Sequence, residues 1–600
     1  MGLKLMNYSI KINEIVVAKE SLSLNICGEI EDSEIANGVL SKPKLVLLFE
    51  NEKEDRRIPF VFEEVSYIGT KCVFSGVYEY RLDMLFWKSR ALNLPFKLNF
   101  ALSYGNEYIE DVKVQFCDIL CDDETPMYIA KVESAKAMSI IPQTSAKKKE
   151  LIITRLFKKL VWAVFKLIML VFAICLIPFF FLEAILAFFG CATLCVIYDG
   201  RVIGAIIGHV NRKFERVCGI KINIARIKRV SIRVIFALFK KCFKLKNNRI
   251  TFISARRTDI SGNFLFVYEE MKSRPDFDSL DVRFVLNDKT IRQLNIIDIL
   301  KFCKACATSK VIVLDEFTPQ IHYIDLRKGT KLVQLWHACG AFKTFGFTRL
   351  GKPKGSPQPT RNHRNYDYVT VSSEYCKRCH SEGFGIPYNN VVPTGIPRTD
   401  VFFDEQYKKI ARDKFYQEYP QFKDKRIIMF APTFRGTVKE TAFYPFDRFD
   451  VEKVINNIPE DYVIIVKHHP FIQNPHPIPE HLSDRVIDLS SSTEINDLLF
   501  ISDLIITDYS SLVFEASLLK IPMLFYVYDL NEYIRDRDFY FDLRLNSPGK
   551  LVFDLDELIN TINEQDYQTD RIEAFKNMFF DKLDGKSTER VANLILNELN

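Results

Sequence analysis

Two histidines in this 600-residue chain each follow a short apolar run, and they are the side chains best suited to proton transfer. His337 ends the stretch KLVQLWH, next to Trp336, and His469 ends VIIVKHH. A third run, LIIT, is followed by Asp508 and two serines. An apolar run of about four residues that ends in polar side chains is typical of parallel strands, whose carboxyl ends border a ligand crevice. We therefore expect the three segments to form one composite active site.

The segment Asp508–Ser511 has the composition of an anion site. It lies between a buried strand and a helix that begins near Leu512, so backbone N–H groups and two hydroxyls face the helix start, where the macrodipole favours negative charge. A phosphate could bind there. The alternative is simple N-capping of the helix by Ser510 or Ser511. Glu515, one turn on, could accept a hydrogen bond from a ribose hydroxyl or complement the helix dipole.

Cations at strand ends favour a phosphate ligand. Because side chains alternate along a strand, Lys467 and His469 share one face and His468 takes the other, so we expect only one of the two histidines to face the crevice with Lys467. A single histidine at such a place is more often structural, but its basic neighbour favours a functional role. Arg435 follows the segment APTF, and Arg398 lies in GIPRTD. Phosphate is the ligand that such a set of cations binds.

The chain from Arg249 onward alternates apolar strands with helical stretches. ITFIS, DVRFVL, KVIVLD, KLVQLWH, YDYVTVSS and NVVPTG form a first series, and RIIMFAPT, DYVIIVKHH, RVIDLS, DLIITDYSS and PMLFYVYD form a second. This βαβ order predicts the α/β class, with two parallel sheets that are covered by helices. We expect two Rossmann-type lobes, residues 249–401 and 402–600, with the ligand in the cleft between them.

Residues 1–125 follow a different, period-two pattern. Apolar residues alternate in runs such as Leu22 to Ile26 and Phe96 to Leu102, and glycines recur between the runs. The pattern predicts a small antiparallel β-sandwich without a catalytic constellation. We expect an accessory domain that packs, docks or contacts a polymer. Pro126 to Ser145 is expected to be a linker, and residues 126–248 as a whole to combine this linker with membrane-associating helices.

One segment carries the excess positive charge. Of the formal net charge of +6, residues 147–249 contribute +17, from 21 Lys or Arg and four acids, and the rest of the chain contributes about −11. The most apolar run, Leu160 to Tyr198, lies in the same segment, and each half is shorter than the roughly 20 residues of a transmembrane helix. Basic clusters flank it on both sides, and the positive-inside bias keeps both flanks cytoplasmic. A re-entrant hairpin or an in-plane anchor is therefore favoured.

A basic amphipathic helix is expected downstream, from Val230 to Leu245. Ile232, Phe236 and Phe239 alternate there with Arg233 and several lysines, which is the composition of a helix that lies on anionic lipid. The alternative is that the apolar segment is a buried helical hairpin of a soluble protein. Nucleic acid is not an expected partner, because the basic residues adjoin a lipid-like apolar run.

The start of the chain and the cysteines indicate the cytoplasmic face of the cell membrane. Met1 to Ser21 lacks the apolar core and cleavage site of a signal peptide. Fourteen cysteines without regular spacing are then expected to be reduced thiols. Cys303 and Cys306 form C-x-x-C, and residues 376–380 read C-x-x-C-H, as in covalent haem attachment. Haem attachment of that kind belongs to exported proteins, and both stretches have helical character in which the spacing arises by chance. We expect no cofactor and no bound metal.

A set of ordered motifs extends from residue 250 to about residue 590. They are W-H at Trp336, G-x-P-R-x-D from Gly395 through Arg398 to Asp400, A-P-T-F-R ending at Arg435, K-x-H-P from Lys467, T-D-Y-S-S with Glu515, and a C-terminal pattern from Arg537 through Asp542 to Gly549. Together they resemble the CDP-glycerol glycerophosphotransferases, which build teichoic-acid-like polymers. The resemblance implies a GT-B-like fold and peripheral membrane attachment. The family loop commonly reads W-H-G-T-P, whereas Ala338, Cys339 and Gly340 follow the histidine here.

The resemblance also implies roles for the motif residues. His337 would be the general base for an acceptor hydroxyl, and His469 would stabilise the departing CMP. Glycerol phosphate would pass from CDP-glycerol to a lipid-linked glycan or poly(glycerol phosphate), with charge stabilisation as the dominant effect. The residues expected to bind the donor and its diphosphate are Thr433, Arg435, Lys467, Asp508, Ser510, Ser511 and Glu515, with Trp336, Gly395, Arg398, Asp400 and Asp542 as further motif residues.

Two other classes of function stay open on the sequence. A related GT-B transferase could use CDP-ribitol or a nucleotide sugar, and a membrane-bound assembly factor without catalysis could bind polymer in the same cleft. The presence of His337, His469, Arg435 and both serines argues against the second. The sequence also leaves open the acceptor glycan, primase or polymerase action, and whether the chain forms an oligomer.

Overall fold

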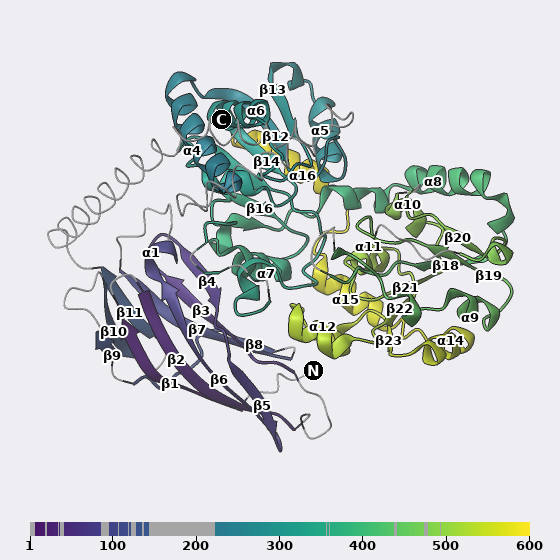
Figure 1. Ribbon diagram of the computed structural model, residues 1–600, viewed down its shortest axis with the longest axis horizontal. Coiled ribbons are helices and arrows are strands. Elements are labelled where there is room, and N and C mark those ends of the chain that lie inside the picture. The colour runs from purple at the N-terminus through teal and green to yellow at the C-terminus, as the bar shows by residue number, and fades with distance from the viewer. Residues whose placement is uncertain are drawn as a thin grey trace, which may run out of the picture.

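We describe the chain from a computed structural model (Figure 1), which shows an N-terminal β-domain beside two α/β lobes. The expected re-entrant hairpin, Leu160 to Tyr198, lies outside the described residues. The described residues are 7–18, 21–33, 35, 41–85, 95–105, 107–117, 119–121, 128–134, 137–142, 223–353, 355, 357–358, 360–436, 441–472, 478–491 and 494–599.

The N-terminal β-domain consists of two sheets that enclose one hydrophobic core. The sheet orders are β5-β6-β2-β1-β9 and β10-β11-β7-β3-β4, with β8 paired to β7, and only β1 with β9 is parallel among the described strand pairs of this domain. Alternate residues such as Leu22, Leu24 and Ile26 point into the core. The elements are β1 (Asn7–Val17), β2 (Ser21–Glu31), β3 (Lys44–Glu50), β4 (Asp55–Pro59), β5 (Glu64–Ile68), β6 (Lys71–Arg81), α1 (Leu82–Leu85), β7 (Phe96–Tyr104), β8 (Glu107–Ile109), β9 (Ile119–Cys121), β10 (Tyr128–Ser134) and β11 (Ala137–Pro142).

A hairpin occupies most of the stretch that the sequence predicts as a linker, Pro126 to Ser145. β10 pairs with β11, and β11 adds to the second sheet by pairing with β7. Met138 and Ile140 are fully buried in the core of the β-domain. The linker prediction is wrong for these residues, because a strand with two buried apolar positions gives too short a period-two signal to be recognised.

The first α/β lobe contains a six-stranded sheet in the order β13-β12-β14-β15-β16-β17, in which every neighbouring pair is parallel. The predicted α/β class with parallel sheets is confirmed. The strand order reverses between β12 and β14, and such a reversal opens a crevice at the carboxyl ends of the strands. The elements are β12 (Lys246–Ser254), α5 (Asn263–Lys272), β13 (Asp281–Leu286), α6 (Ile296–Thr308), β14 (Ser309–Leu314), β15 (Lys331–Gln334), β16 (Tyr368–Thr370), α7 (Glu374–Phe384) and β17 (Val391–Val392).

The second lobe contains a parallel sheet in the order β20-β19-β18-β21-β22-β23. Its order reverses between β18 and β21, so the segments that follow these two strands border a second crevice. The elements are α8 (Glu405–Glu418), β18 (Arg426–Phe430), α9 (Val451–Asn456), β19 (Tyr462–Val466), β20 (Val486–Asp488), α10 (Ile495–Leu499), β21 (Leu504–Thr507), α11 (Leu512–Leu518), β22 (Met523–Tyr526), α12 (Leu530–Asp536), α13 (Leu543–Asn546), β23 (Lys550–Val552), α14 (Leu555–Glu564) and α15 (Arg571–Phe579).

The last helix, α16 (Ser587–Asn597), packs on the first lobe although it follows the second lobe in sequence. Val591 and Ile595 share a hydrophobic cluster with Phe252 of β12 and Phe264 of α5. A helix that returns to the first sheet ties the two lobes together at their junction.

Helix α4 (Ile224–Cys242) has two apolar faces. Ile232 and Phe236, which the sequence indicated for a lipid contact, are buried in the core of the first lobe, and α4 lies against α6. Ile227, Val234 and Leu238 are each more than half exposed on the helix. The prediction that Ile232 and Phe236 face lipid is therefore wrong, because the two side chains pack into the protein core. Within the described residues, no helix has the length and apolar character needed to cross a membrane.

Candidate active site

A cleft of about 440 Å³ lies between the two lobes, at the carboxyl ends of both sheets. One wall is the loop that follows β15, and the other comes from the segments that follow β18, β19 and β21. The structure thus brings together the three segments that the sequence singled out. Of the predicted residues, those that line the cleft are Trp336, His337, Thr433, His469, Ser510 and Ser511.

His337 pairs with a carboxylate that the sequence reasoning missed. Its Nδ1 lies 3.2 Å from Oε2 of Glu316, which follows β14. Burial alone would raise the pKa of Glu316, but His337, Arg256 and Arg257 hold it below its ordinary value, so Glu316 is ionised at neutral pH. A carboxylate that accepts the Nδ1 proton leaves Nε2 of a neutral imidazole able to take a proton. The only signal in the sequence is an acid directly after the strand VIVLD.

Trp336 holds the loop in a left-handed backbone conformation, with a φ of 58°. Such a φ is uncommon for a bulky residue and costs on the order of 1–2 kcal/mol. Asn263, at the start of α5, donates from Nδ2 to the Trp336 carbonyl at 2.8 Å, and the Trp336 N–H donates to Oε1 of Gln334 at 2.9 Å. The indole also contacts the ring of Phe384. These contacts fix the chain direction at the point where His337 enters the cleft.

His469 faces the cleft from the second lobe as a neutral imidazole. Burial, with a further contribution from Lys343, lowers its pKa to about 4. Nδ1 accepts a hydrogen bond from the Phe471 N–H at 3.1 Å. The ring proton is therefore on Nε2, from which the side chain can donate to an anion. His468, its neighbour, is buried.

The two serines have different environments. Ser510 Oγ accepts from the N–H of Leu512, the first residue of α11, at 3.3 Å, whereas the N-cap position itself is occupied by Ser511. The Ser511 hydroxyl forms no hydrogen bond to any described residue. Asp508 lies behind them, buried, and accepts from the Thr433 N–H at 2.8 Å. Ser511 is thus the hydroxyl that a ligand can engage without displacing a protein contact.

Arg435 and Lys467 lie behind the walls of the cleft. Neither is among the described residues that line it. Arg435 pairs with Asp508 at 2.8 Å and with Asp529 at 2.7 Å, and it also donates to the Thr433 carbonyl at 3.0 Å. Lys467 Nζ donates to two backbone carbonyls that follow β20, at 2.7 and 3.1 Å. The structure therefore places both cations as positioning residues, because their charges are already engaged by the protein.

Glu515 connects the two lobes. Its Oε1 accepts hydrogen bonds from Arg398 Nη2 and from Cys339 Sγ, the latter at 3.1 Å. A ribose hydroxyl would have to compete with these two donors for that oxygen. Residue 340 has to be a glycine for a steric reason, because a Cβ there would lie 2.4 Å from the ring of Phe514. Cys339 and Gly340, which depart from the common W-H-G-T-P loop, thus both contact residues of α11.

Three further motif residues have structural roles. Asp400 accepts from the N–H groups of Ser587 at 3.0 Å and Thr588 at 2.7 Å, at the start of α16. Gly395 has a φ of 84°, and a Cβ there would lie 2.2 Å from Ser587 Oγ. Asp542 caps α13. These residues position helices and do not line the cleft, as far as the described residues define its lining.

Three cations in the cleft are absent from the predicted site. They are Lys343, Arg349 and Arg537, and the described lining contains no acid. Burial and the nearby Arg537 lower the pKa of Arg349. Arg349 Nε is also buried and has no hydrogen-bond partner among the described residues. A buried cationic group of this kind is stabilised by an anion. Lys343 lies in the loop that follows β15 and Arg349 ends a short 3₁₀ helix (Gly346–Arg349), so no strand pattern indicates their position.

Residues 235–597, more than half of the chain, match the sequence profile of the family described as CDP-Glycerol:Poly(glycerophosphate) glycerophosphotransferase. The chain belongs to this family. The match includes both α/β lobes and every residue of the cleft named above, and it confirms the resemblance that the motifs indicated.

Two relatives of this chain act on different polyol phosphates by name. The chain is 45% identical over 352 residues to the teichoic acid poly(ribitol-phosphate) polymerase of Bacillus spizizenii, which is 59% of this chain and 56% of that protein. It is 33% identical over 339 residues to the teichoic acid glycerol-phosphate primase of Bacillus subtilis, which is 56% of this chain and 84% of that protein. The matched region is thus little more than half the length of the polymerase.

A solved structure supports the fold of the glycerophosphotransferase family for this chain. A histidine-to-alanine variant of the wall teichoic acid polymerase TagF has a TM-score of 0.51 and 21% identity, and the similarity covers 62% of this chain and 97% of that chain. At this identity the similarity concerns the fold alone.

Proposed function

We propose that the chain transfers a polyol phosphate from a CDP-polyol to a hydroxyl of a lipid-linked or polymeric acceptor, with release of CMP, in the synthesis of a teichoic acid or related surface polymer. The observation that carries this proposal is the chemistry of the cleft, in which His337, backed by Glu316, shares a cationic cavity with His469 and Ser511, and the described lining of this cavity contains no acid. The cationic groups suit a diphosphate, and the paired histidine suits an acceptor hydroxyl.

The proposed reaction is an attack by the acceptor oxygen on the phosphorus next to the polyol. The acceptor hydroxyl gives its proton to Nε2 of His337, the new O–P bond forms, and the bond from phosphorus to the bridging oxygen breaks. CMP leaves with the electron pair of that bond. Glu316 stabilises the imidazolium, and the Nε2–H of His469 and the cleft cations stabilise the charge on CMP. The base contributes roughly 10²–10⁴ in rate.

Ribitol is the first candidate for the polyol and glycerol the second. The relative with 45% identity is named a ribitol-phosphate polymerase, whereas the relative with 33% identity is named a glycerol-phosphate primase. The motif resemblance alone pointed to glycerol. The higher sequence identity to the ribitol-phosphate polymerase supports placing ribitol before glycerol.

We also propose a GT-B-type division of the catalytic part, with residues 249–401 as the acceptor lobe and 402–600 as the donor lobe. Supporting observations are the two parallel sheets and a cleft that both of them border. Helix α16 is the exception to this division, because it lies in the donor-lobe range of the sequence but its apolar face packs on the acceptor lobe.

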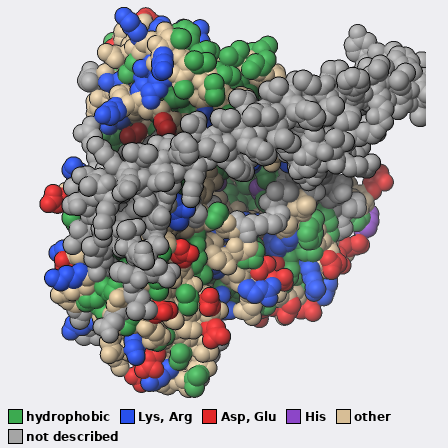
Figure 2. Space-filling view, turned by 60° about the vertical axis from the view of Figure 1, so that its left-hand side comes forward, with side chains coloured by type: hydrophobic (Ala, Val, Ile, Leu, Met, Phe, Trp, Pro, Cys, Tyr) green, Lys and Arg blue, Asp and Glu red, His purple; other side chains and the backbone are tan. Residues whose placement is uncertain are grey.

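Attachment to the cytoplasmic face of the membrane is proposed through the end of the molecule that carries α4 and α6. The exposed stripe of α4 is accompanied by Ile296 and Ile297 at the start of α6, both more than half exposed. In Figure 2, hydrophobic and basic side chains gather on the upper end of the molecule, the level at which α4 and α6 lie in Figure 1. Apolar side chains next to lysines and arginines suit an anionic lipid surface.

A donor panel tests the proposed function. The full chain is incubated with a primed acceptor and with CDP-ribitol, CDP-glycerol or a nucleotide sugar, and the release of CMP or nucleoside diphosphate is measured. We expect CMP from a CDP-polyol, and no CMP from His337→Ala although that variant still binds CDP. Turnover of a nucleotide sugar alone would favour a glycosyltransferase, and CDP binding without turnover would favour an assembly factor.

A further inference from the structure

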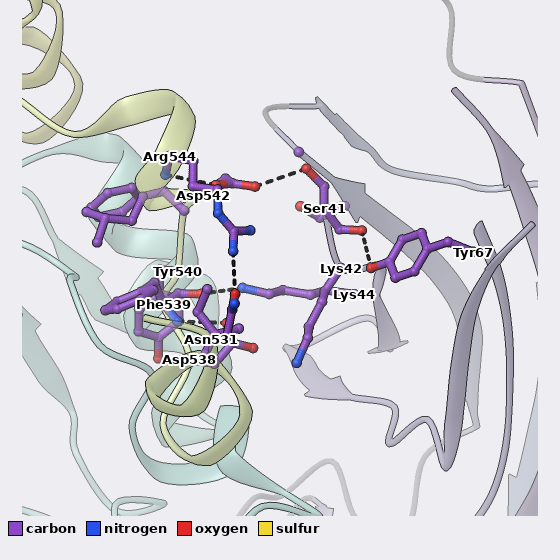
Figure 3. A pocket seen from close by; sticks show the side chains of 15 residues that line it. Ser41, Lys42, Lys44, Tyr67, Asn531, Asp538, Phe539, Tyr540, Asp542 and Arg544 are labelled. Carbon is purple, nitrogen blue, oxygen red and sulfur yellow. Dashed lines mark hydrogen bonds between the residues drawn. The ribbon is translucent and has the colours of Figure 1, made fainter. Parts of the chain in front are cut away.

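A second cavity, of about 450 Å³, lies between the β-domain and the second lobe (Figure 3). The β-domain contributes Ser41, Lys42, Lys44 and Tyr67, and the lobe contributes α12 and the segment that follows it. The cavity shares no lining residue with the catalytic cleft among the described residues. The family match begins only at residue 235, so the β-domain side of this cavity lies outside it.

One chain segment separates the two cavities. Arg537 lines the cleft, and residues 538–544 line the second cavity. Two backbone hydrogen bonds, each 3.1 Å long, join this segment to residues 342–344 of the cleft loop. On the other side, Lys44 Nζ donates to the backbone carbonyl of Phe539. The second cavity is therefore directly behind one wall of the cleft.

The second cavity has an excess of available positive charge. Its cations are Lys42, Lys44 and Arg544, and its acids are Asp538 and Asp542. Asp538 is already paired, at 2.9 Å, with a lysine outside the lining. Asp542 accepts from a serine hydroxyl of the β-domain at 3.0 Å and also caps α13. Both carboxylates are thus occupied, whereas the cations are only partly so.

Lys42 and Arg544 are the two cations best placed for a ligand. Lys42 forms no hydrogen bond or ion pair with any described residue, and its side chain is exposed to solvent. Partial desolvation lowers its pKa; Asp538 opposes this effect, but three neighbouring cations add to it. Arg544 donates to the side-chain oxygen of Asn531 at 2.6 Å and forms no ion pair in the described part of the chain. An ammonium among other cations is stabilised when an anion binds.

We infer that this cavity binds a phosphodiester of the polyol phosphate chain on which the enzyme acts. The inference rests on the proposed function, which provides a ligand of alternating phosphates and hydroxylated carbons. Lys42 and Arg544 bind the phosphate, and the hydroxyls of Tyr67 and Ser103 bond to the polyol. The shared wall places the site within reach of a chain that leaves the cleft past Arg537. This location favours the polymer over a lipid headgroup as the source of the phosphate.

The test compares Lys42→Glu with the matched charge reversal Lys113→Glu in the full chain. Lys113 is exposed on the same domain and does not line the cavity. Each variant is assayed with a primer that carries one polyol phosphate and with a defined oligo(polyol phosphate). We expect Lys42→Glu to bind the oligomer about tenfold more weakly and to make shorter products, with unchanged CMP release on the primer. Lys113→Glu should match the unmodified chain.

Several outcomes would overturn the inference. They are equal oligomer binding by both variants, equal losses of Lys42→Glu on primer and oligomer, and a loss of binding to anionic vesicles with unchanged oligomer binding. If Lys42→Glu fails to fold, as judged by its melting temperature, Arg544→Gln carries the same test. Failure of the unmodified chain to release CMP from any CDP-polyol contradicts the proposed function itself, and that result is distinct from normal turnover without oligomer binding.

Discussion

The two histidines of the cleft are suited to opposite tasks because their neighbours differ. His337 is paired with the carboxylate of Glu316, which stabilises the ring when it takes up a proton. His469 is half-buried near Lys343, and this environment keeps its imidazole neutral with the proton on Nε2. One ring is thus prepared to accept a proton and the other to donate a hydrogen bond to the leaving group.

Replacing Glu316 by Gln should lower kcat about a hundredfold, out of the roughly 10²–10⁴ that a general base contributes. The amide keeps the shape of the side chain but cannot stabilise the imidazolium, and Glu316 is a positioning residue for His337. KM for the CDP-polyol should change little, because Glu316 belongs to the first lobe. Steady-state kinetics with donor and acceptor varied in turn measure kcat and the KM for each substrate separately.

Glu316→Asp should recover part of the lost kcat, and Glu269→Gln, which changes an exposed carboxylate on α5, should have no effect. A rise in KM for the donor with unchanged kcat would contradict the assignment of Glu316 to the base.

Ser511→Ala and Ser510→Ala should separate donor binding from the hydrogen bond at the start of α11. Ser511 has a hydroxyl without a partner among the described residues, so its loss should weaken the binding free energy of CDP by roughly 1.5–3 kcal/mol, the value of a hydrogen bond to a charged group, with little change in Tm. Ser510 Oγ accepts from the first N–H of α11, so its loss should cost about 1 kcal/mol of stability. Calorimetric binding of CDP and thermal melts measure both. The reverse pattern would exchange the two roles.

At the scale of elements, the junction between the lobes depends on α16 and its cap. Asp400→Ala removes the acceptor for two N–H groups at the start of this helix and should destabilise the chain by about 1 kcal/mol. Urea denaturation measures the loss. Asp404→Ala, which removes the cap of α8, is the matched control. We expect kcat and KM to stay unchanged, and a large fall in kcat at unchanged stability would move Asp400 into the active site.

The sequence predicted every strand of the two parallel sheets except β23, and it predicted the three segments that bring His337, His469 and Ser511 to the cleft. Each apolar run of the two predicted series contains a strand of a parallel sheet, because continuous apolar runs are what a sheet buried on both faces requires. For the same reason, polar residues such as His337, His469 and Ser511 could be assigned to the edge where ligands bind.

Other parts of the site could not be predicted, because they depend on contacts between distant segments. Glu316 gains a role only when β14 lies beside β15, and Arg349 ends a 3₁₀ helix of four residues, which is too short to give a periodic signal. Arg435 looks like a phosphate ligand in the sequence, but two carboxylates that follow later strands engage it. Pairing of this kind cannot be read from spacing along the chain.

At the scale of the whole molecule, buried histidines make stability depend on pH. Burial lowers the pKa of His380 to about 4, below the value of about 6.5 in the unfolded chain. The unfolded state therefore binds more protons between these values, so the stability present above about pH 6.5 is lost as the pH falls toward 4. For His380 alone the loss between pH 7.5 and 5.5 is about 1 kcal/mol.

Urea denaturation at both pH values tests this dependence. His380→Phe, whose ring suits the surrounding aromatic cluster of Phe345 and Phe384, should lose less stability on acidification than the unmodified chain. The quantity compared is the change in the free energy of unfolding between the two pH values, so a difference in absolute stability between the two proteins does not affect the test. An equal or steeper loss in His380→Phe would show that His380 is not the group that titrates.

The end of the molecule that carries α4 and α6 should determine part of its affinity for membranes. Ile227, Val234 and Leu238 lie on one face of α4 and are each more than half exposed, whereas Ile232 on the opposite face is buried. Transfer of three half-exposed aliphatic side chains to lipid contributes about 3 kcal/mol in total. Replacing the three by Ser should therefore weaken binding to anionic vesicles roughly a hundredfold, with unchanged CMP release from a soluble donor and primer. Vesicle co-sedimentation at fixed salt measures the partition coefficient.

Serine replacements at the exposed residues Val65, Ile68 and Val77 of the β-domain are the matched control and should leave vesicle binding unchanged. Equal vesicle binding by the α4 variant and this control would show that the exposed stripe of α4 does not contact lipid.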